Sequence, residues 1–407
     1  MKNIHIKKTI LTLVLVILLP LSSIFAFDFG FIVNSNASYA DHGSGDNVFE
    51  FNVDLWPRFS MLIGNSGELY ISAGFTYGLD GNDFYYVPEL MRTDITLRFG
   101  DMGFRAGRMF YSDPLSFISE GLFDGAQFFI NTGFGRFSLG AWYTGFLYKK
   151  NANITMTEDD QTNFALALDY GDFFNTYFAS NRLIAAFDWV HPSLAEILNL
   201  NFSVIAQMDF NRALTEHNSL YVVLKAGLPL DRFLIELGAS LELSQSDPGG
   251  NNMSVAGDFG FFWTLPTPFN SRLALTAKVA GGGVQDLFTP FTPITTKYFG
   301  DVLKHSMSGL SVIGLNYTAR LGQAFGTSIS ASYFVRNDLA TYNTYPVVAG
   351  SDGYFLGCEF FGRVVWSPLS DLQLTLGGGA FLPFLGNAGS DESIKWRIDV
   401  SAIISLY

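Results

Sequence analysis

Apolar and polar residues alternate with a period of two along nearly all of the chain. The clearest stretches are residues 198–210, 233–243 and 394–406, where every second residue is apolar and most of those between are polar. A β-strand points successive side chains to opposite faces, so this period is typical of strands with one apolar and one polar face. Helical spacing is nearly absent, with room only for single turns near residues 193–200 and 302–305. The pattern predicts an all-β protein.

The connections between the predicted strands are of two kinds. The short ones have the composition of tight turns and cover residues 64–67, 100–102, 132–135, 229–232, 322–326 and 367–371. The long, more polar ones cover residues 40–47, 78–89, 112–122, 245–252, 281–305, 337–352 and 383–393. Short turns at one end and long loops at the other are typical of transmembrane β-barrels. The layout predicts a closed antiparallel transmembrane β-barrel with short periplasmic turns and long extracellular loops.

The number of strands follows less directly from the pattern. Nineteen segments qualify as candidate strands, whereas a closed barrel made from a single bacterial chain has an even number. The conflict lies between residues 136 and 191, where residues 151–162 and 171–181 are both ambiguous. We therefore expect about eighteen strands, with sixteen and twenty still open.

Composition supports a barrel whose outer surface does not face water. Hydrophobic residues make up 48% of the chain and charged residues only 15%, and there are 41 Phe; soluble domains carry roughly 25% charged residues. The hydrophobic content excludes disorder. The chain has 24 basic and 37 acidic residues, a net charge of −13, so it would repel nucleic acid. Much of the Phe is expected to face lipid.

The first 26 residues have the features of a secretory signal peptide. Lys2, Lys7 and Lys8 precede a short apolar stretch, and Ala26 is a suitable cleavage site. A membrane anchor is the alternative interpretation of this segment. Removal of residues 1–26 takes away three lysines and no acidic residue, so the net charge becomes −16. Residues 27–407 would then form one outer-membrane barrel domain.

Several Trp residues precede short connections that contain Pro. Trp189, Trp263 and Trp366 have this position, and Trp396 lies on the apolar face of the last strand. Trp side chains collect at membrane interfaces because the ring is apolar and its N–H is polar. The four Trp residues are predicted to form an aromatic girdle, against the alternative that they pack at strand ends of a sandwich.

The signal peptide, the alternating strands from Phe27, the turn asymmetry and the terminal strand Ile394–Tyr407 together resemble a bacterial outer-membrane β-barrel of the porin kind. The resemblance is architectural and covers residues 27–407. It implies a location in the bacterial outer membrane and recognition of the C-terminal strand by the barrel assembly machinery. Tyr407 departs from that pattern, because it lies one step out of register with the Trp396 face.

A local stretch also resembles porin-like families: Gly107-Arg108 ends one predicted strand, and Phe123-Asp124-Gly125 opens the next. In general porins the third long loop folds inward and narrows the channel. Here that loop covers residues 112–122, without the Pro-Glu-Phe-Gly-Gly signature of general porins. A surface loop with solvated charges is the alternative. The candidate constriction and lumen residues are Arg98, Arg105, Arg108, Asp113, Glu120 and Asp124.

A second loop competes for this role. Residues 281–305 form the longest predicted loop and are dense in aromatic residues and Pro. That composition favours an ordered loop that folds over the mouth of the barrel, or one that packs on a neighbouring subunit.

The sequence contains no recognisable catalytic, phosphate-binding or metal-binding motif. None of the five His residues lies in an alternating strand beside a Ser or carboxylate in a triad-like arrangement. No glycine-rich phosphate loop joins a strand to a helix. The acidic run Glu158-Asp159-Asp160 is expected to be a solvated rim of an external loop, since no calcium-loop pattern surrounds it. We therefore predict no enzyme, no catalytic residues, no metal and no cofactor.

The leading hypothesis is a channel for passive diffusion of small hydrophilic solutes, because barrels of this size leave an aqueous lumen. Its partners would be outer-membrane lipid, the assembly machinery and small solutes, and not nucleic acid. The acidic balance predicts a preference for cations. The alternative is a surface adhesin or structural barrel with an occluded lumen. The sequence names no solute and leaves monomer and homo-oligomer both open.

Overall fold

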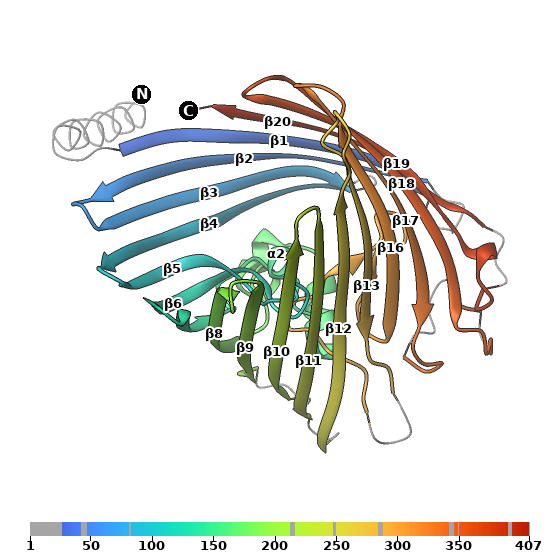
Figure 1. Ribbon diagram of the computed structural model, residues 1–407, viewed down its shortest axis with the longest axis horizontal. Coiled ribbons are helices and arrows are strands. Elements are labelled where there is room, and N and C mark those ends of the chain that lie inside the picture. Colours follow the sequence, from blue (N-terminus) through green and yellow to red (C-terminus); the bar gives the residue numbers. More distant parts are fainter. Residues whose placement is uncertain are drawn as a thin grey trace.

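Eighteen antiparallel strands form one sheet that closes on itself, because the first strand pairs with the last (Figure 1). The closing pair runs from Phe31 opposite Leu406 to Asp41 opposite Trp396. The computed structural model describes residues 27–41, 47–80, 83–211, 216–246, 250–283, 288–341, 346–348, 350–389 and 393–406. The predicted signal peptide lies outside these residues. The closed barrel and its eighteen strands confirm the expected fold.

The wall strands are β1 (Phe27–Asp41), β2 (Asn47–Ile63), β3 (Gly67–Asp80), β4 (Asp83–Phe99), β5 (Met102–Ser112), β6 (Glu120–Thr132), β7 (Gly135–Tyr143), β8 (Arg182–Leu194), β9 (Leu198–Asp209), β10 (His217–Leu230), β11 (Phe233–Ser246), β12 (Gly250–Thr264), β13 (Arg272–Ala280), β16 (Leu310–Arg320), β17 (Phe325–Arg336), β18 (Phe355–Leu369), β19 (Leu372–Leu382) and β20 (Lys395–Leu406). A small separate hairpin consists of β14 (Tyr298–Phe299) and β15 (His305–Ser306). The helical segments are α2 (Lys149–Ala152), α3 (Glu158–Ala165), η2 (Tyr170–Asp172), α4 (Phe173–Thr176) and η3 (Pro383–Leu385).

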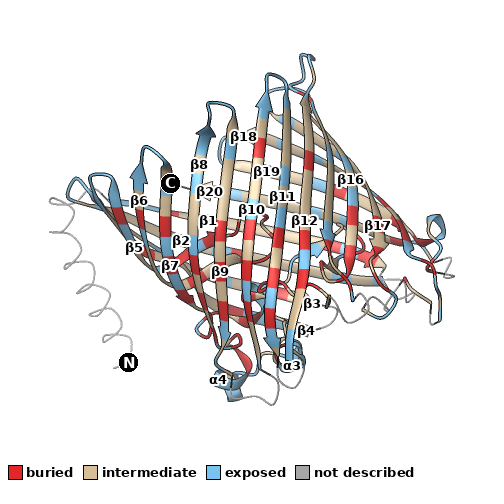
Figure 2. Cartoon of the chain, turned by 60° about the horizontal axis from the view of Figure 1, so that its bottom comes forward, coloured by how far each residue is buried: buried red, intermediate tan, exposed pale blue. Residues whose placement is uncertain are grey.

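Each predicted short turn lies at one end of the barrel, which is also the end where β1 begins and β20 ends. Gly64 and Gly100 have φ of 59° and 61° in these turns, a conformation that Gly adopts without strain. The other end carries the long connections together with α3 and α4 (Figure 2). In two predicted long loops, residues 78–89 and 245–252, the strands extend further than expected, because β-pairing continues to Asp80–Asp83 and to Ser246–Gly250.

The ambiguous region between residues 136 and 191 contains one long connection, residues 144–181. Neither residues 151–162 nor residues 171–181 form a wall strand, which brings the count to eighteen and puts the turn after Trp189 at the same end as the other short turns. The expectation that helices would be limited to single turns is wrong at α3. Thr157 and Asp160 form a capping box at its start. This local signal is independent of the alternation of apolar and polar residues.

The outer face of the wall is apolar. Leu237, Ile329 and Val400 are typical outward residues, each more than half exposed, and such a surface is stable only in contact with lipid. In the described part of the chain, no helix is long and apolar enough to cross a membrane.

The four predicted girdle residues lie at the two ends of the barrel. At the turn end, Trp189, Trp263 and Trp366 each stack on a Phe of the adjacent strand, with ring centroids 5.9–6.2 Å apart. Trp396 lies near the loop end, 5.4 Å from the ring of Tyr39. Their interfacial role stays a prediction.

Candidate functional site

Three of the long connections fold into the barrel and contact one another there. They are residues 113–119, residues 144–181, whose α3 and α4 stay at the loop end (Figure 2), and residues 281–283 with 288–309, which we call the strap. The amide of Thr295 in the strap donates to Ile118 O at 3.1 Å, and the amide of Thr296 donates to Asn153 O at 2.7 Å. Their apolar side chains form one buried cluster with the inner wall, to which the loops contribute Leu115, Phe117, Ile118, Leu147, Ala152, Ile154, Ala179, Phe291, Ile294 and Met307.

Residues 113–119 cross the lumen from β5 and β6 to the opposite wall. The carboxylate of Asp113 accepts four backbone N–H bonds from within this loop, at 2.7–3.0 Å, which fixes its tight conformation. The tip reaches β11 and β13, where Leu115 packs on Gly238 and the ammonium of Lys278 lies 4.9 Å from the ring centre of Phe117. The loop therefore closes the side of the lumen that lies between β5 and β13.

The connection 144–181 is held by a buried group of charges. Arg182, at the start of β8, bonds Asp160 at 2.5 Å and Asp209 at 3.1 Å, and none of the three side chains is more than 1% exposed. Asp160 is the N3 residue of α3. The expectation that residues 158–160 form a solvated rim therefore fails for Asp160, although Glu158 and Asp159 are exposed. The run of acidic residues does not show that Asp160 pairs with Arg182, which lies 22 residues later in the chain.

The strap runs across the lumen between two walls. Near its middle, the amide of Thr292 donates to Glu242 of β11 at 2.9 Å, and Lys297 bonds Glu120 at 2.9 Å. Its tip is the β14–β15 hairpin, which reaches Glu359 of β18. The expected ordered loop is thus present, but it folds into the barrel and packs on the inner wall.

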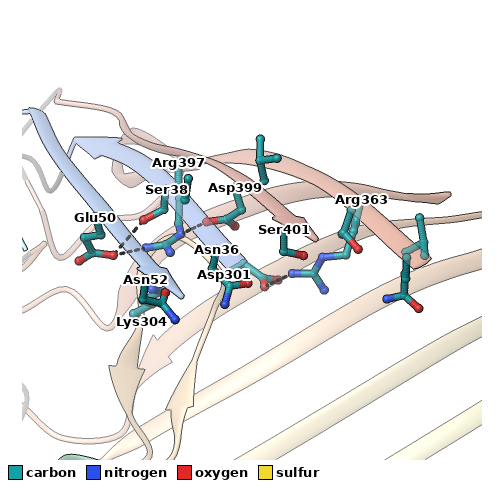
Figure 3. Close-up of a pocket in the computed structure, with 15 residues that line it drawn as sticks. Asn36, Ser38, Glu50, Asn52, Asp301, Lys304, Arg363, Arg397, Asp399 and Ser401 are labelled. Carbon is teal, nitrogen blue, oxygen red and sulfur yellow. Dashed lines mark hydrogen bonds and ion pairs between the residues drawn. The ribbon is translucent and has the colours of Figure 1, made fainter. Parts of the chain in front are cut away.

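A polar cavity of about 590 Å³ remains between the strap tip and the inner wall of β18, β19, β20, β1 and β2 (Figure 3). We call this cavity the eyelet. Its charged lining residues are Glu50, Asp301, Lys304, Arg363, Arg397 and Asp399, and its neutral polar ones are Asn36, Ser38, Asn52, Gln373, Thr375 and Ser401. Positive and negative side chains are equal in number, so the eyelet is strongly polar but balanced.

Most of these charges are paired. Arg397 lies 2.5 Å from Asp399 and 3.7 Å from Glu50, and Arg363 of the wall lies 3.2 Å from Asp301 of the strap. Lys304 forms no ion pair with any carboxylate of the described residues. Burial and the nearby positive charge of Arg397 lower the pKa of Lys304 below that of an ordinary lysine. Lys304 is also the most exposed of the three eyelet cations.

The polar lining continues along the same wall toward the turn end. Asp54 accepts hydrogen bonds from Asn34, Asn52 and Thr76 at 2.7–3.2 Å. Beyond it, a smaller cavity of about 240 Å³ is bordered by residues that include Asp28, Arg58, Ser60 and Tyr70. A polar strip thus connects the eyelet with the turn end.

Three of the predicted constriction residues remain inside the barrel on the walls or at the loop bases. Arg105 bonds Asp94 through two contacts of 2.7 and 2.8 Å, and Arg92 bonds the same carboxylate at 2.6 Å. Arg98 is exposed near the turn end. Glu120 bonds the strap through Lys297. None of them lines the eyelet.

The other three do not face open lumen. Asp113 is only 2% exposed, and its carboxylate accepts hydrogen bonds from the backbone amides of its own loop. Arg108 and Asp124 form a two-contact ion pair at 2.7 and 2.8 Å. They alternate with Met109 and Phe123, whose buried side chains belong to the cluster inside the barrel, so the pair lies on the outer face. Arg108 also donates to Leu90 O and Phe146 O, where pairing between β4 and β5 has ended at Thr93.

The residues that line the eyelet were not singled out from sequence. Glu50, Arg363, Arg397 and Asp399 occupy the polar positions of alternating strands, so their inward direction could be predicted. Nothing in the strands indicates that these four positions face one cavity. Asp301 lies in the competing loop, where no period assigns a direction to its side chain. Among the described residues there is no cluster of His, Cys, Asp and Glu that could hold a metal ion.

No protein-family model and no curated protein matches this sequence. Among solved structures, the barrel is similar to OccK1 (OpdK) of Pseudomonas aeruginosa, with a TM-score of 0.61 and 12% identity over 93% of this chain and 98% of that one. It is also similar to OccK2 (OpdF) of Pseudomonas aeruginosa in complex with glucuronate (TM-score 0.60, 12% identity, 94% and 97% covered) and to Pseudomonas aeruginosa OpdK with vanillate (0.59, 11%, 93% and 99%). The fold is that of outer-membrane porins.

Proposed function

We propose that this protein is an outer-membrane channel for the passive diffusion of small hydrophilic solutes, and that the eyelet is its narrowest point. The observation that carries the proposal is the polar cavity between the strap tip and five consecutive wall strands, inside a barrel with an apolar outer face. Charged groups of both signs across a narrow opening select solutes by charge and dipole, as they do in other pores. No step in this function needs a catalytic residue.

The direction of ion preference is the finer part of the proposal. The chain is acidic overall, with 37 acidic against 24 basic residues, which favours cations. The eyelet itself is balanced, so the preference is expected to be weak. Glucuronate and vanillate, which accompany two of the structural neighbours, are carboxylates and suitable first organic probes, because Lys304 and Arg397 would attract them.

The test is reconstitution of the purified protein in planar bilayers. We expect stable single-channel steps, a reversal potential of cation-selective sign in a KCl gradient, and lower current when glucuronate is added. Absence of conductance from correctly folded protein would overturn the channel. Anion preference would overturn the argument from net charge.

A barrel with an occluded lumen is the second candidate. It is favoured by the three loops that fill the side of the lumen between β5 and β13. Binding of the protein to host surfaces or matrix, together with the absence of conductance in planar bilayers, would support this alternative.

A further inference from the structure

We propose that Glu359 is the positioning residue of the eyelet: its carboxylate holds the main chain of the strap tip and thereby places Asp301 and Lys304 in the opening. This inference rests on the proposed channel function. Glu359 does not line the cavity; it acts through the residues that do.

The contact is a carboxylate inside a ring of backbone donors. Glu359 accepts from the amide of Asp301 at 2.6 Å through Oε1, and from the amides of Val302 and Leu303 at 3.0 and 2.8 Å through Oε2. Successive backbone N–H groups that converge in a turn form an anion-binding nest. The side chain is only 2% exposed. No described basic side chain forms an ion pair with it, so the nest supplies its compensation.

The turn is shaped for this carboxylate. Gly300 has a φ of 85°, and a Cβ at this position would lie 2.8 Å from Glu359 Oε2 and 3.0 Å from the ring of Phe334. Lys304 closes the turn with a φ of 48°. A non-glycine residue at position 300 would therefore meet both backbone strain and the carboxylate itself.

The two charged residues at the ends of this turn, Asp301 and Lys304, line the eyelet. Asp301 reaches Arg363 on the wall, and Lys304 enters the eyelet beside Arg397 and Glu50 (Figure 3). Val302 and Leu303, between them, are buried against Phe334 and Phe381. Because the two charged side chains flank the bonded amides, the position of the carboxylate decides how far they project from the strap.

Glu242 offers a matched control. It is also a buried wall glutamate, 1% exposed, and it also accepts a strap amide, that of Thr292. However, it holds the strap in the filled part of the lumen and is absent from the eyelet lining. If the eyelet depends on strap anchoring in general, both glutamates should matter; if it depends on the nest, only Glu359 should.

The experiment compares wild type, E359Q and E242Q by single-channel recording. Gln keeps the shape of Glu but presents an amide NH₂ to one of the tip donors, so the nest is no longer satisfied. We expect E359Q to show a higher conductance and an ion preference that differs from wild type, with E242Q unchanged in both. Equal effects of the two variants, or wild-type conductance and preference in folded E359Q, would overturn the proposal.

A second readout does not depend on conduction. In a Cys358→Ser background, Lys304→Cys is labelled with a charged thiol reagent in the presence and absence of E359Q. We expect faster labelling with E359Q, because the released tip exposes the thiol; equal rates would contradict the positioning role even if no channel activity is found. If E359Q does not assemble, Gly300→Ala disturbs the same contact while keeping the charge, and the same changes are expected.

Discussion

Leu115, at the tip of the loop between β5 and β6, packs directly on the backbone of Gly238 on the opposite wall. A Cβ at position 238 would lie 2.3 Å from Leu115 Cδ2, well inside contact distance. The loop can cross the lumen only because β11 has no side chain at this point. The absence of a side chain at Gly238 therefore allows the loop to close one side of the barrel.

Gly238→Val is therefore expected to destabilise the barrel or expel the loop, at a cost of about 1–3 kcal/mol from overpacking. Chemical unfolding in detergent would measure the loss. Gly257→Ala on β12 is the control, because the nearest atom to its added Cβ is 3.6 Å away, and it should be nearly neutral. Equal losses in both variants would show that the Leu115 contact is unimportant.

Arg182 stabilises the connection 144–181 by neutralising two buried carboxylates. Arg182→Met should cost about 3–5 kcal/mol, because Asp160 and Asp209 would remain buried and uncompensated. The unfolding midpoint and protease cleavage within residues 144–181 are the measurements. Arg320, which donates to Gln323 O in an exposed turn, provides the control as Arg320→Met. Wild-type stability of Arg182→Met would contradict the anchoring role.

The ion pair between Arg363 and Asp301 should affect selectivity far more than stability. Both side chains are more than 40% exposed, and such pairs contribute roughly 0–1 kcal/mol. Arg363→Gln removes one of the three eyelet cations, so the reversal potential should move toward stronger cation preference. A large loss of stability without a change in selectivity would refute this assignment.

Lys304 should make selectivity depend on pH in the alkaline range. Because its pKa is below that of an ordinary lysine, it loses its proton earlier as the pH rises. The eyelet then becomes net negative and cation preference should increase. Lys304→Met should have the stronger preference already at neutral pH and should lack this rise. If the variant shows the same pH dependence as wild type, another group is responsible.

Much of the fold could be predicted because it is encoded locally. The period of two assigns a face to each strand residue, and turns such as the one at Gly64 mark the end of a strand wherever a positive φ is needed. These signals predict a closed barrel, its apolar outer face and its strand number to within two. They fail between residues 144 and 181, because buried charges and helix caps, which have no period of two, stabilise that segment.

The eyelet depends on contacts that no local pattern encodes. The sequence identifies two of the three loops that enter the lumen, but not their roles. Asp113 was predicted to face the lumen, and the structure gives it four backbone amides of its own loop. Asp301 meets Arg363 across 62 residues of chain, and Glu50 meets Arg397 only because β1 closes the barrel against β20. The sequence by itself determined that wall residues alternate between an inner and an outer face, although Arg108 and Asp124, which were predicted to face the lumen, lie on the outer one. Tertiary structure decided which of the inward residues face one opening, since that depends on barrel closure and on how the strap packs inside it.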